Sequence, residues 1–295
     1  MRRMPGRAAA ERRGWLAAHK WLLARRLSQL AVFGLFLLGP LAGVWLLRGN
    51  LSSSVVLDTV PLTDPFLLLQ TLLAGHGPEL TALAGGALVL AAYLLVGGRV
   101  YCAWVCPLNP VTDLAAWLRR RIGLDGAGGR LDPRLRWALL AAALGGAALT
   151  GTALWELVNP VSIVQRGIIF LLAPAAWVAL AVFLFDLLVV PRGWCGRLCP
   201  AGAFWGMVGQ AAVLRVTAPH RERCDHCMDC YAACPEPQVI RPALEGPGAP
   251  LIASGMCTNC GRCIDVCPQD VFRFGTRFHG KTMTAGLPGG REETT

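Results

Sequence analysis

The chain has 295 residues, of which 54% are hydrophobic and only 16% charged, with a mean hydropathy of +0.48. A soluble domain of this length would carry about a quarter of charged residues, so the composition excludes an ordinary soluble globular protein. We attribute the net charge of +10 to membrane topology and to attraction for anionic lipid, and expect no nucleic-acid partner.

Four segments are predicted to be membrane-spanning helices, because a bilayer core needs about 20 consecutive apolar residues. They cover residues 27–47, 80–98, 137–155 and 168–190. The only charged residue within them is Asp186, which we expect to pair with a cytoplasmic arginine such as Arg99 or Arg192. A shorter apolar stretch at 65–74 predicts an interfacial or re-entrant helix, which Asp64 can cap.

The distribution of lysine and arginine predicts that both chain termini lie in the cytoplasm. The N-terminal segment 1–26 carries eight basic residues and the loop 99–136 carries seven. The loop 49–79 carries none, and the loop 159–167 carries only Arg166. The alternation predicts a multi-pass protein with two outer loops.

A Cys-x3-Cys-Pro motif follows the second predicted span, at Cys102 and Cys106, and another follows the fourth, at Cys195 and Cys199. This equivalence predicts an internal repeat of two helical hairpins. Cysteines at i and i+4 of a helix point the same way, so the four thiols are expected to converge on the cytoplasmic side. Three interpretations stay open: a third metal centre, a redox-active dithiol, or small buried hydrophobes that dock the C-terminal module.

The C-terminal quarter contains the run Cys-x2-Cys-x2-Cys-x3-Cys-Pro twice, which is typical of bacterial ferredoxins with two [4Fe–4S] clusters. In that pattern the fourth cysteine of each run binds the cluster of the other run. The predicted ligands are Cys224, Cys227, Cys230 and Cys267 for cluster 1, and Cys257, Cys260, Cys263 and Cys234 for cluster 2. A single zinc site or a disulfide scaffold explains this spacing poorly.

The predicted architecture is therefore an α-helical membrane domain of four helices followed by a cytoplasmic, ferredoxin-like α+β domain. The membrane domain covers 27–190, a membrane-proximal connector covers 191–215, the ferredoxin domain covers 216–280, and a disordered tail covers 281–295. We expect the connector to place an amphipathic helix, 201–215, at the membrane interface.

Most of the chain resembles the NapH family of membrane-bound ferredoxin-type proteins from bacterial periplasmic nitrate-reductase systems. Besides the spans and all twelve cysteines, the resemblance rests on local sequences at 49–54, 58–65, 104–110 and 183–190. It implies a quinol-dehydrogenase subunit of the bacterial inner membrane that takes electrons from ubiquinol or menaquinol. It also implies a periplasmic iron–sulfur partner of the NapG type, with the periplasmic nitrate reductase downstream; a NapC-type multihaem cytochrome can belong to the same route.

A second function stays open, because families involved in nitrous-oxide respiration, methylamine metabolism and cytochrome-oxidase assembly share this plan. The alternative is a membrane iron–sulfur factor for the assembly or maturation of another respiratory metalloenzyme. The elaborate first outer loop favours the quinol dehydrogenase.

No motif marks a quinol site, which needs proton acceptors within hydrogen-bond reach of the quinol hydroxyls. The candidates on the predicted outer side are Asp58, Asp64, His76, Glu79, Glu156, Gln165 and Arg166. Glu156 is the first choice, since it directly follows an apolar span and Trp155, where partial burial would raise its pKa. The sequence contains no haem-ligation motif that would carry electrons from cytoplasmic clusters to the periplasm.

Overall fold

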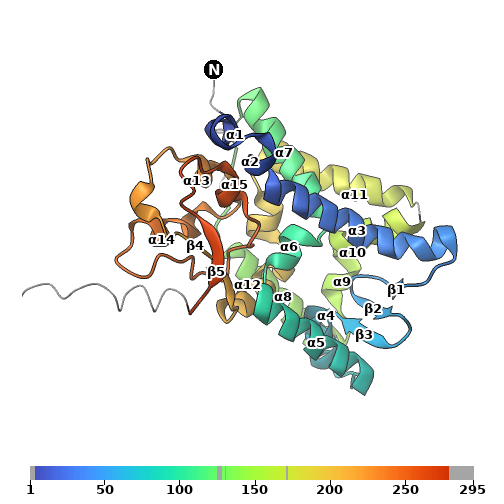
Figure 1. Ribbon diagram of the computed structural model, residues 1–295. Helices are drawn as coiled ribbons and strands as arrows, with labels where there is room; N and C mark the ends of the chain where they lie inside the picture. Colours follow the sequence, from blue (N-terminus) through green and yellow to red (C-terminus); the bar gives the residue numbers. More distant parts are fainter. Residues whose placement is uncertain (1–3, 125–127, 130, 171, 279–295) are drawn as a thin grey trace, which may run out of the picture.

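The computed structural model describes residues 4–124, 128–129, 131–170 and 172–278, so the predicted tail at 281–295 lies outside the described residues. Figure 1 shows the ferredoxin part, in orange and red, at one end of the molecule. A small sheet of strands β1 to β3 lies toward the other end, and long apolar helices run between the two.

Helix α3 (Lys20–Ala42) is long and apolar enough to cross a membrane by length and composition. The predicted span 27–47 was wrong at both ends, because the helix begins earlier and stops at Gly43, which is left-handed with φ 70°. The chain then folds back, so that a Cβ on Gly39 would lie 2.4 Å from the ring of Trp45. Residues 44–47 therefore belong to the outer turn.

The other predicted spans are shorter helices: α5 (Leu80–Val96), α8 (Leu135–Thr150) and α11 (Ala173–Leu184), which continues as the π-helical turn η1 (Phe185–Val189). The predicted bounds 137–155 and 168–190 were wrong. Left-handed Gly151 (φ 68°) ends α8, and Trp155 lies in a separate helix, α9 (Leu154–Val158). Residues 168–170 close helix α10 (Pro160–Phe170), and Pro174 stands in the first turn of α11.

The first outer loop forms an antiparallel sheet of β1 (Leu47–Gly49), β2 (Ser53–Val56) and β3 (Val60–Thr63), followed by α4 (Pro65–Leu73). As predicted, Asp64 caps this helix, its Oδ1 accepting from the backbone N–H of Phe66 at 3.0 Å. Phe66 is 1% exposed and packs 5.2 Å from the ring of Phe204. The outer loop therefore enters the helical core.

The inner side of the bundle contains α6 (Val100–Trp104), α7 (Leu108–Ile122), the π-helical turn η2 (Trp194–Leu198) and α12 (Pro200–Gln210). The expectation of an interfacial helix at 201–215 was wrong. Phe204 and Trp205 are only 8% and 2% exposed, in a core cluster with Phe66 and Leu140. Because α12 carries bulky rings toward α8, it is a core helix that ends at Gln210.

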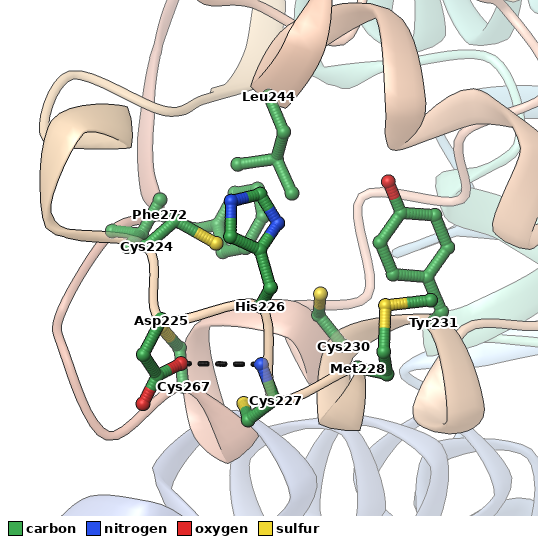
Figure 2. A pocket seen from close by; sticks show the side chains of 11 residues that line it. Cys224, Asp225, His226, Cys227, Met228, Cys230, Tyr231, Leu244, Cys267 and Phe272 are labelled. Atoms are coloured by element: carbon green, nitrogen blue, oxygen red, sulfur yellow. Dashed lines mark hydrogen bonds between the residues drawn. The ribbon is translucent and has the colours of Figure 1, made fainter.

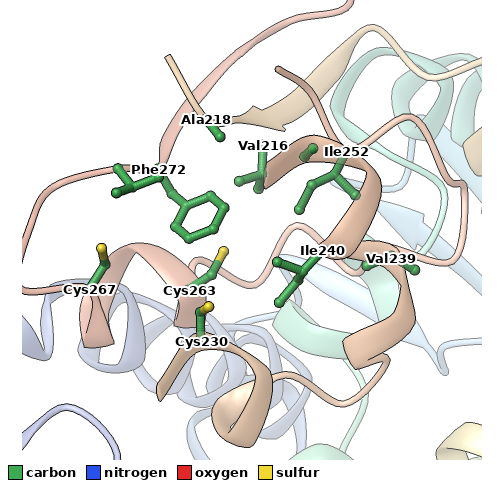
Figure 3. Packing of buried hydrophobic residues seen from close by; sticks show 11 residues of the cluster. Val216, Ala218, Cys230, Val239, Ile240, Ile252, Cys263, Cys267 and Phe272 are labelled. Atoms are coloured by element: carbon green, nitrogen blue, oxygen red, sulfur yellow. The ribbon is translucent and has the colours of Figure 1, made fainter. Parts of the chain in front are cut away.

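In the ferredoxin part, β4 (Leu214–Thr217) pairs antiparallel with β5 (Arg273–Thr276) beside four short helices. These are α13 (Asp229–Ala233), the 3-10 helix η4 (Pro237–Val239), α14 (Arg241–Glu245) and α15 (Arg262–Val266). A further 3-10 helix, η3 (Arg221–Arg223), precedes the first cysteine run. Figure 3 shows Val216, Ile240, Ile252 and Phe272 packed next to Cys230 and Cys263. The hydrophobic core thus surrounds the cysteines.

The N-terminal helices α1 (Arg7–Arg13) and α2 (Trp15–Ala18) dock on this ferredoxin part. The backbone N–H groups of Trp21 and Leu22 donate to the carboxylate of Asp265 at 3.1 and 2.9 Å. The Trp21 ring lies 4.6 Å from Phe274, edge to face. The basic segment 1–26 is therefore joined to the ferredoxin domain through its described residues, in addition to leading into α3.

Candidate iron–sulfur sites and their connection to the helices

The four cysteines predicted for cluster 1 line one small cavity. Cys224, Cys227 and Cys230 come from the first loop and α13, and Cys267 comes from the end of the second run. Figure 2 shows these side chains together with Tyr231 and Leu244. The exchange of the fourth cysteine between the runs therefore brings the predicted set together.

A second cavity is lined by the four cysteines predicted for cluster 2, namely Cys234, Cys257, Cys260 and Cys263. Cys260 and Cys263 are 7% and 8% exposed. Arg262 lines the same cavity, and Val216, Val239 and Ile240 form its apolar side. Five residues that line this cavity also belong to the hydrophobic core of the ferredoxin part, namely Val216, Val239, Ile240, Ile252 and Cys263.

Both cysteine loops share a backbone conformation that suits an anionic cluster. His226 and Met228 are left-handed in the first loop (φ 53° and 64°), and Asn259 and Gly261 are left-handed at the equivalent positions of the second (φ 44° and 72°). Left-handed residues in tight turns orient successive backbone N–H groups into a concavity that binds anions, iron–sulfur clusters among them. The two loops are therefore a structural as well as a sequence repeat.

The arrangement of the thiols does not match a single-ion site. Among the described residues, no group of three or more His, Cys, Asp or Glu side chains could hold a single metal ion. A tetrahedral zinc would bring its thiolates within about 4 Å of one another, since Zn–S bonds are about 2.3 Å. Four cysteines around a cavity with inward-turned loops fit a [4Fe–4S] cube.

The electrostatic surroundings of the two cavities differ. Burial alone would raise the pKa of Cys260, but Arg262 and Arg25 outweigh it and lower that pKa below its ordinary value. Burial raises the pKa of Cys230 to about 12, and neighbouring Cys267 and Cys224 add to the shift. Positive charge therefore favours the thiolate of Cys260, whereas burial raises the pKa of the other cluster 2 candidates, Cys234, Cys257 and Cys263.

The two Cys-x3-Cys-Pro motifs adopt similar local structures, although the expected i, i+4 helical alignment was wrong. Cys102 lies in the short helix α6 and Cys195 in η2, but Cys106 and Cys199 lie after these turns. The reason is that the proline after each second cysteine starts a new helix, α7 or α12. Each motif is thus a short turn, a cysteine and a helix start.

The four thiols nevertheless gather in one region, where Cys106 is buried and Cys102, Cys195 and Cys199 are half-buried. Burial raises the pKa of Cys195 well above its ordinary value, and the nearby Cys106, Cys199 and Cys102 raise it further. Burial also raises the pKa of Cys199, to about 11, with Cys102 as the next cause. Redox-active dithiols need a lowered pKa in a partly exposed site, so this environment disfavours that interpretation.

A buried ion-pair group joins the helices to the ferredoxin part. Glu236, which follows the cluster 2 candidate Cys234 by two residues, accepts from Arg99 at 2.9 Å and from Arg136 at 2.6 Å. All three side chains are at most 3% exposed. Arg99 also donates to the carbonyl of Cys195 at 3.1 Å. One arginine therefore touches both the second cysteine motif and the ferredoxin part.

A small cavity lies along the same connection. Cys102 and Cys195 line it from the helical side, and Pro235 and Thr258, neighbours of cluster 2 candidates, line it from the ferredoxin side.

The predicted ion pair of Asp186 was wrong, because its Oδ1 accepts from the backbone N–H of Trp194 at 2.9 Å. Arg192, its other expected partner, donates instead to the carbonyl of Ala233.

On the outer side, the structure gathers some of the quinol-site candidates. Glu156 accepts from Ser52 at 3.0 Å and from Asn159 at 3.1 Å, and Arg166 lies 3.7 Å away. The side chain of Gln165, 1% exposed, accepts from the backbone N–H of Leu51 at 2.8 Å.

Asp64 adjoins this group through Ser52, whose carbonyl accepts from the Asp64 backbone N–H at 2.8 Å. Burial raises the pKa of Asp64 to about 7, and the charge of Glu156 contributes to the rise. Asp58 instead pairs with Arg48 at the surface, and exposed Glu79 accepts from Thr81.

Several functional residues escaped sequence analysis. Ser52, Asn159 and Ser162 complete the outer group. Of these three, only Asn159 had a signal in the sequence, because it precedes the proline that starts α10. Glu236 and Arg136 also went unnoticed, although a glutamate directly after Cys234-Pro235 is an available signal.

Comparisons with known proteins agree with this geometry. A family model described as a 4Fe-4S binding domain matches residues 79–125 and 168–218, the two segments that carry the Cys-x3-Cys-Pro motifs. A 4Fe-4S dicluster domain model matches residues 223–271, which contain the eight ferredoxin cysteines.

The ferredoxin-type protein NapH of Escherichia coli (strain K12) is 49% identical over 278 residues, which cover 94% of this chain and 96% of the relative. The chain belongs to the NapH family of ferredoxin-type proteins. It is also 54% identical over 270 residues to the methylamine utilization ferredoxin-type protein MauN of Paracoccus denitrificans, covering 92% and 95% of the two chains. No solved structure matches the chain significantly. The family and the 4Fe-4S domains identify an iron–sulfur electron-transfer protein.

Proposed function

We propose that this protein is the membrane electron-transfer subunit of a quinol dehydrogenase that delivers electrons toward a periplasmic nitrate reductase. The observation that carries the proposal is the continuous connection from the outer carboxylates, through the cysteine motifs, to the cluster 2 cavity. Cys106 packs with Leu51, Val161 and Val164, neighbours of the outer polar group. Arg99 and Glu236 then link Cys195 to the ferredoxin part.

The proposed arrangement has four spans, both termini in the cytoplasm and the protein in a bacterial inner membrane. The basic N-terminal segment docks on the ferredoxin part, and the outer sheet, whose strands contain the single arginine Arg48 among their described residues, lies away from it. Fusions after residue 62 should be active as periplasmic alkaline phosphatase, and fusions after residue 125 should fluoresce as cytoplasmic green protein. The reverse pattern would move the ferredoxin part to the periplasm.

In this proposal the eight ferredoxin cysteines hold two [4Fe–4S] clusters, in the sets that line the two cavities. The clusters would supply one-electron storage, and the chain would position and insulate them. Cys102, Cys106, Cys195 and Cys199 would hold a third, soft-metal or iron–sulfur centre, since their raised pKa values disfavour dithiol chemistry. Asp64 and Glu156 would accept the protons released by the quinol, ubiquinol or menaquinol.

The proposed partners are the membrane quinone pool and a periplasmic iron–sulfur protein of the NapG type, with a NapC-type cytochrome where the route includes one. The 49% identity to NapH supports this route, and the 54% identity to MauN supports a methylamine route as the second candidate. In the second route the protein would act in the maturation of another metalloenzyme.

One experiment separates electron delivery from maturation. In a strain that lacks this protein, periplasmic nitrate reduction should persist with reduced methyl viologen, which feeds the reductase directly, but should fall severely with quinol as the donor. Restoring the gene should restore the quinol-dependent rate. Loss of the viologen-driven rate as well would identify a maturation factor, and unchanged quinol-driven nitrate reduction would overturn the proposal.

A further inference from the structure

A wide groove lies between the N-terminal segment, α7 and the ferredoxin part, and Arg262 separates it from the cluster 2 cavity, because that side chain lines both. Its volume is about 710 Å³, within the range of about 300–1,000 Å³ that is usual for ligand pockets. Residues from several separate stretches line it: the segment 4–6, α2, α3, α7, the turn after η1, α13 and α15. A groove built from so many stretches has a shape fixed by the fold.

Positive charge dominates the groove walls. Six arginines line it against two aspartates: Arg25, Arg26, Arg120, Arg121, Arg192 and Arg262 against Asp113 and Asp265. Among the described residues, His19 is the only other titratable side chain that lines it. The fold therefore concentrates basic side chains on one concave surface.

The two aspartates are already engaged. Asp113 alone pairs with Arg25, Arg26 and Arg262. Both oxygens of Asp265 accept from backbone N–H groups at the start of α3. Burial, followed by repulsion from Arg262, lowers the pKa of Arg192 to about 10. Since so little negative charge is available within the groove, an anion from outside would be strongly attracted.

One wall of the groove is apolar and exposed. On α7, Leu114 and Trp117 are 53% and 45% exposed, and the Arg121 guanidinium lies 5.4 Å from the Trp117 ring centroid. Arg26 lies in the second turn of α3, the helix that is long and apolar enough to cross a membrane. Tryptophan beside arginine at the end of a span is typical of the level of lipid headgroups.

We propose that this groove binds the phosphate headgroup of an anionic diacyl phospholipid, with the acyl chains along Leu114 and Trp117. The inference rests on the proposed membrane placement, but not on quinol oxidation. The arginines supply charge-assisted hydrogen bonds to phosphate oxygens, and basic pockets beside spans on the cytoplasmic side commonly bind anionic lipid. The exposed apolar wall favours a lipid over an acidic protein. Acyl chains would cover Leu114 and Trp117, whereas an acidic protein surface would leave these apolar side chains uncovered.

The test uses the full-length protein with its clusters in a neutral detergent, titrated with dioleoylphosphatidylglycerol and observed by native mass spectrometry. Parallel titrations use dioleoylphosphatidylcholine and inorganic phosphate. The test variant carries Arg120→Gln and Arg121→Gln. The matched control carries Arg241→Gln and Arg273→Gln, two exposed arginines of the ferredoxin part that do not line the groove. Iron content and cluster spectra show whether each variant is intact.

We expect phosphatidylglycerol to be retained and phosphatidylcholine lost at equal concentration. The test variant should bind phosphatidylglycerol about thirtyfold more weakly, since each basic residue near a membrane surface contributes about a fivefold factor; the control should change less than twofold. Equal retention of both lipids, or an unchanged affinity in an intact test variant, would overturn the proposal. Displacement of the lipid by equimolar inorganic phosphate would identify a free-phosphate site instead. A failure of quinol-driven nitrate reduction would leave these binding results unaffected.

Discussion

Replacing Glu236 by glutamine should uncouple the ferredoxin part from the helical bundle. The substitution keeps the shape of the side chain but removes the charge that faces Arg99 and Arg136. Those guanidinium groups are 2% and 3% exposed, so water cannot take over the role of the carboxylate. A third arginine, Arg197, lies 3.8 Å from the same carboxylate and adds to the repulsion.

The expected loss is large for a single substitution. Removing one partner of a buried ion pair costs about 3–5 kcal/mol, because the remaining charge stays buried without compensation. For a chain of this size about 1 kcal/mol corresponds to roughly 2–4 °C, so the melting temperature should fall by about 6–20 °C. The effect should be largest for the ferredoxin part, which Glu236 anchors.

The assay is anaerobic thermal unfolding of the full-length protein in detergent, followed by intrinsic fluorescence, with iron content measured before each scan. The matched control is Glu245→Gln, which breaks an exposed i, i+4 pair with Arg241. The side chains of Arg241 and Glu245 are 76% and 44% exposed. Exposed pairs contribute about 0.5 kcal/mol or less, so this control should melt within about 2 °C of the wild type. Equal melting temperatures for Glu236→Gln and the control would refute the role assigned to the buried group.

Three further predictions concern the metal sites and the outer carboxylates. Cys230→Ala should lower the iron content from about eight atoms by about four, because cluster 1 loses a ligand. Asp64→Asn should slow quinol-driven cluster reduction at least tenfold. Loss of a general base costs about a hundredfold or more where the chemical step limits the rate, so tenfold is a lower bound that allows for another limiting step. The wild-type rate should rise with pH up to about 7, as Asp64 loses its proton, and the variant should lack this rise. Cys102→Ala and Cys195→Ala should be as damaging singly as together, while the ferredoxin clusters still assemble.

The controls for these variants use residues outside each site. Glu79→Gln removes an exposed outer carboxylate and should leave the rate and its pH dependence unchanged. Stoichiometric zinc without iron would contradict the iron–sulfur assignment. A wild-type pH profile in Asp64→Asn would remove that residue from the proton path. Wild-type rates in the double cysteine variant would reduce the Cys-x3-Cys-Pro motifs to packing.

The sequence predicted best where the chemistry imposes a spacing. The eight ferredoxin cysteines line two cavities in the two predicted sets, because a cube with exchanged ligands requires that order along the chain. The Asp64 cap was predictable for a similar reason, since the side chain acts on a backbone group only two residues away. In both cases the information is local or repeated.

Helix ends and long-range contacts were not predictable in this way. Hydropathy could not show that Gly151 would adopt a left-handed conformation and end α8, or that Pro174 would separate α11 from α10. The burial of Trp205 depends on α12 packing against α8, which no pattern within 200–210 reveals. The buried Glu236 group joins three segments more than 30 residues apart in the chain, so only the folded protein brings them together.

Tyr101 packs against the core clusters of both Phe66 and Cys106. Burial raises the pKa of Tyr101 well above its ordinary value, and the nearby charges of Cys106 and Asp64 raise it further. This half-buried side chain is therefore close both to an outer-loop carboxylate and to a cysteine motif. Its ring also lies 6.3 Å from Tyr93 and 6.0 Å from Trp205. Because the outer loop enters the core through α4, a few packed rings separate Asp64 from the first cysteine motif. In the proposed function, an electron released by a quinol beside Asp64 would cross these rings to reach the cysteines.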